Sequence, residues 1–268
     1  MSNAQLLNSD TWPTFVAGWT HDSKTVLLTA TRFGKRGIFE KNLRDGHMQA
    51  LVSGGDSYDS PVLTPDGQLL LYTESLADGT VRLMRMPFHG GAATLVQPGR
   101  HSYACAALPS TRCLLADING NEIVFSLLDP LKGAGKQVAK IESVKRRAFA
   151  WSLSSDGKRI AALEEGVVQQ VGIVDLEGGS MKVIPVKGWN SLQSLSWSSD
   201  GSHLYVTGQS SPRHTWSLLY LDFAGRIKVL NEAAPQAWVN APLPSPDGTH
   251  LIFNEKSWEN DAVMLENF

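Results

Sequence analysis

The sequence predicts an all-β fold, a six-bladed β-propeller of four-stranded antiparallel blades. A short turn phrase, in which an aspartate is followed by glycine and then by apolar residues, returns along the chain. Its aspartate position recurs at intervals of 44, 44, 46, 44 and 47 residues, counted through Asp22, Asp66, Ser110, Asp156, Asp200 and Asp247. A repeat of this length containing several short strands is typical of a propeller blade, so six positions predict six blades.

The turn phrase itself predicts a tight β-hairpin. In the second copy, Pro65 presets the φ angle of a type I turn, and Gly67 supplies the left-handed residue of a three-residue hairpin loop. Ser23 replaces this glycine in the first copy, and the third copy, Pro109-Ser110-Thr111, lacks both the aspartate and the glycine. The remaining copies are Ser155-Asp156-Gly157, Ser199-Asp200-Gly201 and Pro246-Asp247-Gly248.

Each repeat is expected to supply four strands, and the second shows this most clearly. Its strands are predicted over residues 61–64, 68–73, 80–86 and 92–96, with a glycine-bearing turn, His89-Gly90-Gly91, before the last. The final repeat supplies three strands, over 240–243, 249–254 and 261–266, and then ends. Gln5 lies as far before Asp22 as Gln49, in the last strand of the first repeat, lies before Asp66. We therefore expect residues 5–7 to supply the missing strand of the last blade and close the ring.

Composition predicts one domain spanning residues 1–268, with Met1-Ser2-Asn3-Ala4 interpreted as the remnant of an expression tag. The net charge of −2 argues against nucleic-acid binding. No apolar run is long enough for a membrane-spanning helix, and no signal peptide is visible. Whether the protein is periplasmic or cytoplasmic in a bacterium is expected to depend on native sequence before the tag remnant. We expect a monomer without a cofactor.

The two cysteines, Cys105 and Cys113, lie on either side of the degenerate third turn. Because side chains alternate between the two faces of a strand, the positions of the two cysteines relative to that turn predict that both side chains emerge on the same face. They would lie diagonally across the hairpin, near the distance limit for a disulfide bond. A disulfide, which would imply an oxidising compartment, and two free core thiols are both compatible with this placement.

The repeat resembles the TolB-like propeller repeat, which is related to WD40 units but lacks their Trp-Asp signature. The resemblance covers nearly the whole chain through Asp22, Asp66, Asp156, Asp200 and Asp247. Further stretches resemble the C-terminal sensor propellers of bacterial winged-helix regulators or serine/threonine kinases, among them residues 18–24, 129–133 and 264–268. TolB itself carries an additional N-terminal domain, which has no counterpart in this sequence.

In such a propeller the loops between strands two and three, and those between blades, share one face, where a binding site is expected. Each loop between blades carries an aromatic residue, and together these could form a collar: Trp12, Tyr58, Tyr103, Phe149, Trp189 and Trp238. The alternative is that these rings wedge between blades and fill core.

Basic residues on the same loops could form a rim for an acidic partner or ligand. They are Arg32 and Arg36 in the first repeat, Arg146 and Arg147 before the fourth, and Arg213 with His214 in the fifth, joined by Trp258 in the sixth. The alternative is a set of scattered, solvated charges.

No sequence motif of catalysis is present, so the sequence predicts that the chain is not an enzyme. It predicts a module of a larger regulator or envelope protein that binds a protein partner or a small polar ligand through its loop face. One rival is a propeller hydrolase or lyase with a site in the central channel, for which Asp10, Asp56 and Asp59 are the nearest candidate metal ligands. A second rival is a carbohydrate binder that uses the aromatic collar.

Overall fold

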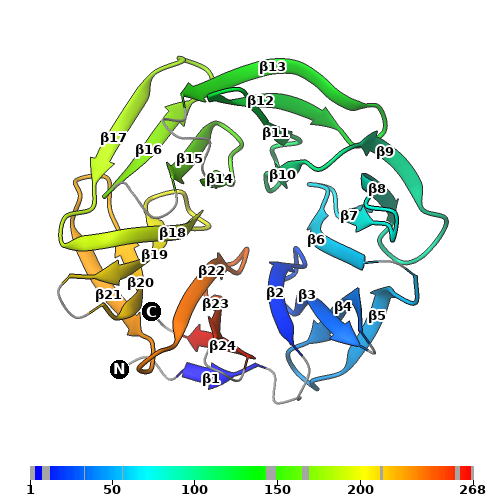
Figure 1. Ribbon diagram of the computed structural model, residues 1–268, viewed down its shortest axis with the longest axis horizontal. Helices are drawn as coiled ribbons and strands as arrows, with labels where there is room; N and C mark the ends of the chain where they lie inside the picture. The colour runs from blue at the N-terminus through cyan, green and yellow to red at the C-terminus, as the bar shows by residue number, and fades with distance from the viewer. Residues whose placement is uncertain are drawn as a thin grey trace. The chain divides into compact units, whose positions relative to one another are not determined.

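The computed structural model describes residues 4–7, 13–32, 34–55, 57–142, 149–164, 169–211, 214–256 and 260–266. Within these ranges the secondary structure consists of β-strands (Figure 1). No described segment forms a helix with the length and hydrophobicity needed to cross a membrane. The chain divides into two compact units, one formed by Trp12–Ile141 and the other by Met1–Thr11 together with Glu142–Phe268.

The unit Trp12–Ile141 contains three four-stranded sheets, each made of consecutive strands. The first blade consists of β2 (Thr14–Trp19), β3 (Thr25–Arg32), β4 (Lys35–Asn42) and β5 (Met48–Val52). The second consists of β6 (Ser57–Leu63), β7 (Leu69–Ser75), β8 (Val81–Pro87) and β9 (Thr94–Pro98). The third consists of β10 (Ser102–Cys105), β11 (Cys113–Asn119), β12 (Glu122–Asp129) and β13 (Gly133–Glu142).

The other unit also contains three four-stranded sheets. The fourth blade consists of β14 (Phe149–Leu153), β15 (Arg159–Glu164), β16 (Gln170–Asp175) and β17 (Met181–Pro185). The fifth consists of β18 (Trp189–Trp197), β19 (Leu204–Ser210), β20 (Trp216–Leu221) and β21 (Ile227–Glu232). The composite blade joins β22 (Trp238–Pro244), β23 (His250–Lys256) and β24 (Asn260–Glu266) to β1 (Ala4–Leu6).

These sheets confirm the predicted all-β fold of four-stranded antiparallel blades. Five blades are built from consecutive strands, and the remaining sheet draws its strands from both ends of the chain. Its N-terminal strand runs antiparallel to β24, with Ala4 opposite Leu265 and Leu6 opposite Val263. The predicted strand over 5–7 is therefore present one residue earlier, and Ala4, which was assigned to a tag remnant, belongs to it.

The second strand of each blade is buried on both faces, as β7 illustrates. Successive side chains of a strand point to opposite sides of the sheet. Leu70 and Tyr72 join a hydrophobic cluster with Leu27 and Ile38 of the first blade. Leu71 between them joins a different cluster, with Leu115 of the third blade. Neighbouring blades within a unit thus share cores, which explains the uninterrupted apolar runs that follow the turns in the sequence.

The predicted hairpin turn is present, and a hydroxyl group that the sequence analysis overlooked reinforces it. In the second blade, the Thr64 hydroxyl donates to Asp66 Oδ1 at 2.6 Å, and the same carboxylate oxygen accepts the N–H of Gln68 at 3.0 Å. The N–H of Leu69 donates to the Thr64 hydroxyl at 3.0 Å. Gly67 has a φ of 71°, as the turn requires. We call this arrangement the Ser/Thr-Asp turn network.

Four other blades repeat the Ser/Thr-Asp turn network with nearly the same geometry. The hydroxyl donates to the aspartate at 2.5 to 2.7 Å in the pairs Thr20–Asp22, Ser154–Asp156, Ser198–Asp200 and Ser245–Asp247. Hydrogen bonding to the ionised form lowers the pKa of a carboxyl group. The Ser198 hydroxyl, with the N–H and hydroxyl of Ser202, accordingly lowers the pKa of Asp200 to about 2, although partial burial opposes the shift.

The third blade lacks the network and closes its turn with a disulfide between Cys105 and Cys113. Ala106 occupies the position of the hydroxyl residue, because its N–H donates to the carbonyl oxygen of Arg112 at 2.8 Å as the N–H of Thr64 donates to that of Leu69 in the second blade. The two cysteines lie directly opposite each other in the register of β10 and β11, with their Cα atoms 4.0 Å apart. The predicted diagonal placement was wrong, because the hairpin register pairs the two positions face to face.

The first strand of a blade is longer than predicted where it contains a register shift. In the second blade the shift lies between Asp59 and Val62, so β6 begins at Ser57 instead of residue 61. In the composite blade it lies between Asn240 and Leu243. Such bulges insert an unpaired residue and bend the strand, which a count of turn residues does not reveal.

Candidate functional site

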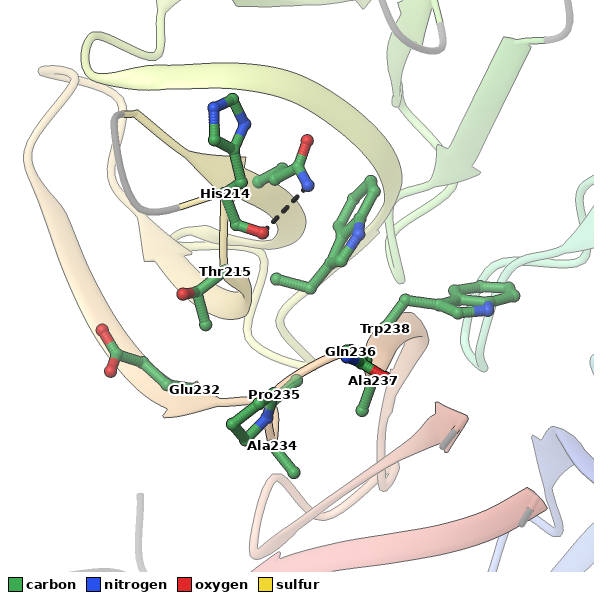
Figure 2. Close-up of a pocket in the computed structure, with 11 residues that line it drawn as sticks. His214, Thr215, Glu232, Ala234, Pro235, Gln236, Ala237 and Trp238 are labelled. Atoms are coloured by element: carbon green, nitrogen blue, oxygen red, sulfur yellow. Dashed lines mark hydrogen bonds between the residues drawn. The ribbon is translucent and has the colours of Figure 1, made fainter. Parts of the chain in front are cut away.

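A pocket of about 600 Å³ lies on the unit that contains the fifth and composite blades (Figure 2). One wall comes from the hairpin of β19 and β20, with Gln209 and Trp216 on the strands and His214 and Thr215 on the loop between them. The other comes from the connection between β21 and β22 (Glu232–Trp238). These are a loop between strands two and three and a loop between blades, the two loop types on which the sequence predicted a site.

Backbone and side-chain hydrogen bonds hold the wall around His214. The N–H of His214 donates to the carbonyl oxygen of Ser210 at 3.0 Å. Gln209 Nε2 donates to the carbonyl oxygen of His214 at 2.9 Å, the bond drawn as a dashed line in Figure 2. His214 has a φ of 56°, in the left-handed region that side chains other than glycine seldom adopt. Its exposed imidazole is therefore presented by a fixed backbone.

The opposite wall is a tight turn fastened to both neighbouring blades. The N–H of Ala233 donates to the carbonyl oxygen of Trp216 at 2.8 Å, and that of Ala237 donates to Ala234 at 2.9 Å. The N–H of Ala234 donates to Glu255 Oε1 on β23 at 3.1 Å. Gln236, at the tip, has a φ of 67°, so a second lining residue is held in the left-handed region.

The base of the pocket rests on the core shared by the fifth and composite blades. Ala233 and Ala237 are buried in one cluster with Tyr205 and Phe253, and Trp216 packs against it. The small alanine side chains leave the space that the pocket occupies. Figure 2 shows Ala234, Pro235, Gln236 and Ala237 along one side, with His214 and Thr215 across from them.

The lining combines an apolar base with a few groups that form hydrogen bonds. It offers two amides, one hydroxyl, one imidazole, one carboxylate and two indoles, in Gln209, Gln236, Thr215, His214, Glu232, Trp216 and Trp238. Concave sites with an apolar surface and a small number of polar groups are typical of small-ligand binding. Neither lysine nor arginine is among the lining residues in the part of the chain that the structure describes, which leaves out residues 212–213 of the loop before His214.

Two of the predicted site residues, His214 and Trp238, meet in this pocket although they come from different loops. The sequence analysis missed Gln209, Trp216 and Glu232. Their signal was present in part, because Glu232 opens an unusual Glu-Ala-Ala-Pro-Gln-Ala connection between blades. Gln209 and Trp216 lie within strands β19 and β20, and they line the pocket only because the hairpin folds them towards that connection.

Other members of the predicted aromatic collar pack between blades. Tyr103 is buried, and its hydroxyl donates to the carbonyl oxygen of Ser60 at 2.7 Å. Tyr58 contacts the edge of Tyr72, with ring centroids 5.9 Å apart. Trp189 is buried in the core of the fourth and fifth blades, and Phe149 is half-buried at the start of β14. Trp12 and Trp258 lie outside the described residues.

The two arginines of the predicted basic rim that the structure describes, Arg32 and Arg36, both contact other side chains of their own unit. Arg36 pairs with Asp59 at 2.6 Å and lies over the ring of Phe15. The guanidinium carbon of Arg32 lies 5.7 Å from the centroid of the Phe39 ring. Arg146, Arg147 and Arg213 lie outside the described residues.

The candidate metal ligands of the rival enzyme hypothesis are described only in part. Asp59 is the partner of Arg36, and Asp10 and Asp56 lie outside the described ranges. Among the residues that the structure describes, no group of three histidine, cysteine, aspartate or glutamate side chains is placed to hold a metal ion.

Comparison with known proteins identifies the fold. No protein-family model and no curated protein sequence matches the chain. Among solved structures, TolB from Acinetobacter baumannii matches with a TM-score of 0.66 and 20% identity over 83% of this chain. This chain spans 55% of the length of that TolB. The putative TolB from Agrobacterium tumefaciens matches with a TM-score of 0.68 and 14% identity, covering 99% of both chains.

An enzyme shares the fold to a similar extent. Oligogalacturonate lyase from Vibrio parahaemolyticus matches with a TM-score of 0.64 and 12% identity, covering 99% of this chain and 97% of the lyase. A puromycin hydrolase is also among the similar structures. The chain thus has a TolB-like propeller fold that enzymes also use. This finding overturns the prediction that the chain is not an enzyme, since the absence of a motif in the sequence does not remove that class.

Proposed function

We propose that this TolB-like propeller recognises a small polar ligand, free or as a short segment of a partner, in the pocket between the fifth and composite blades. The observation that carries the proposal is the composition of the pocket. An apolar base and a limited set of polar side chains converge there from two loops, which is the composition of a small-molecule site.

Backbone conformation supports the same location. A residue other than glycine in the left-handed region costs roughly 1–2 kcal/mol, and such residues gather at functional sites. His214 and Gln236 both adopt this conformation, and they lie on opposite walls of the same pocket. The fold maintains two unfavourable conformations where the ligand would enter.

Ligand binding is tested with intrinsic tryptophan fluorescence and thermal shift against a panel of saccharides, amino acids and short peptides. We expect a saturable change that Trp216→Phe and His214→Ala weaken by about tenfold, because each changes a side chain that lines the pocket. His47→Ala, which alters an exposed histidine of the other unit, is the matched control. Saturable binding that survives both pocket variants would contradict the proposal. Consumption of a bound panel member would assign an enzyme to the same pocket.

We also propose that the two units close into one six-bladed domain, serving as a module of a larger bacterial regulator or envelope protein. A single compact domain of 268 residues has an expected radius of gyration of about 18 Å. Small-angle X-ray scattering that gives a clearly larger value would contradict closure. The native reading frame around this sequence tests the role as a module, since a winged-helix, kinase or TolB-type segment is then expected beside it.

A further inference from the structure

We infer that the pocket between the fifth and composite blades selects ligands that carry a protonated amine over neutral ligands, and neutral ligands over acidic ones. This inference rests on the proposed function and adds the charge class of the ligand. It follows from the charges and the hydrogen-bond acceptors of the lining.

Among the described residues that line the pocket, the fixed charge is negative. Glu232 contributes a carboxylate to the wall, and none of the described lining residues is a lysine or an arginine. A second carboxylate, Glu255, lies behind the same wall, where its Oε1 accepts the N–H of Ala234. Lys256 pairs with Trp238 in the sheet register, but it does not line the pocket. An anionic ligand would meet repulsion there, and a cation would meet attraction.

The amide of Gln209 adds an acceptor on the opposite wall of the pocket. Because its Nε2 is committed to the carbonyl oxygen of His214, its Oε1 remains to accept a hydrogen bond. Glu232 also acts purely as an acceptor when ionised. An ammonium group has three donors and no acceptor, so it complements these two side chains.

The electron-rich faces of indole rings favour cations as well. Trp216 and Trp238 both contribute to the lining and are both half-buried. In Figure 2 the Trp238 ring extends away from Glu232, so the side of the pocket nearest the carboxylate relies on charge and hydrogen bonding. We therefore place Glu232 as the main source of selectivity.

Three sugars of nearly equal shape test this selectivity, namely glucosamine, glucose and glucuronate, titrated at millimolar concentration and followed by ligand-observed NMR. We expect glucosamine to bind about two- to fivefold more tightly than glucose, the range expected for one partly exposed ion pair, and glucuronate to bind most weakly. Glu232→Gln should remove the glucosamine preference. Glu177→Gln, which alters an exposed turn of the fourth blade, should leave it intact. Raised salt should weaken the preference in the parent protein.

Three outcomes overturn the inference: glucuronate binding as tightly as glucosamine, a preference that persists in Glu232→Gln, or no binding of any of the three sugars while another panel ligand binds in the pocket. A panel in which nothing binds overturns the proposed function as well, so the two failures are distinguishable.

Discussion

The hairpin turn of the third blade and those of the other five close the same structure by different chemistry. Five turns use the Ser/Thr-Asp turn network, in which one hydroxyl and one carboxylate satisfy the backbone N–H groups of the turn. The third has no such pair of hydroxyl and carboxylate groups, and its two strands are joined by the Cys105–Cys113 disulfide. Every repeat needs a closed hairpin at this position, and either a covalent bond or a set of hydrogen bonds can close it.

Among changes to the six hairpin turns, removing the disulfide should produce the largest loss of stability. For the double variant Cys105→Ser/Cys113→Ser we expect a loss of about 2–3 kcal/mol of stability, because a short closed loop no longer limits the unfolded chain. Amide hydrogen exchange should show lost protection concentrated in β10 and β11. Protection lost equally in the first and second blades would mean that the bond does not act locally.

A smaller loss is expected when one hydroxyl is removed from the Ser/Thr-Asp turn network. The Ser245 side chain is fully buried, donates to Asp247 at 2.6 Å and accepts the N–H of His250 at 2.9 Å. Ser245→Ala should cost about 1–2 kcal/mol, since it leaves the half-buried N–H of His250 without that acceptor. The matched control is Ser110→Ala in the third turn, where the hydroxyl accepts a 3.3 Å bond from the N–H of Arg112. Equal losses of urea stability in the two variants would contradict the comparison.

Placing a side chain at the left-handed position of a turn should cost slightly less. Gly67 has a φ of 71°, and a methyl group added there would lie 3.1 Å from His21 Nδ1, the end of a mobile side chain. We expect Gly67→Ala to destabilise by about 1 kcal/mol, chiefly through the backbone. A thermal unfolding midpoint unchanged from the parent would show that the turn tolerates the conformation, as the first blade does with Ser23 at a φ of 59°.

Acid should produce the smallest effect, and only in turns that contain an aspartate. Because the pKa of Asp200 is lowered to about 2 in the folded protein, below its ordinary value of 3.8, its ionised form stabilises the fold above about pH 4. This contribution is lost as the pH falls from 4 towards 2. Asp200→Asn should therefore lower the urea midpoint at neutral pH and show a shallower decline in acid. Parallel pH profiles for the parent and the variant would exclude this linkage.

The repeat predicts the blades well because the turn chemistry and the apolar runs are both local in the sequence. It cannot reveal the bulge at Asp59–Val62, or the direct pairing of Cys105 with Cys113, because both depend on register. His214 and Trp238 could be predicted for the pocket from their loops alone. Tyr103 and Trp189 carry the same signal but pack between blades, since loop position does not determine which way a ring turns.

The pairing of β1 with β24 has a consequence for the order in which the protein is made. The unit Trp12–Ile141 is continuous in the chain, so its three blades can form while synthesis proceeds. The other unit pairs Ala4–Leu6 with Asn260–Glu266, which leaves the ribosome more than 250 residues later. Until β1 and β24 pair, each exposes unpaired backbone N–H and C=O groups along a strand edge, and such an edge can pair with other chains. Chaperone protection during synthesis would therefore matter most for the unit that carries the pocket.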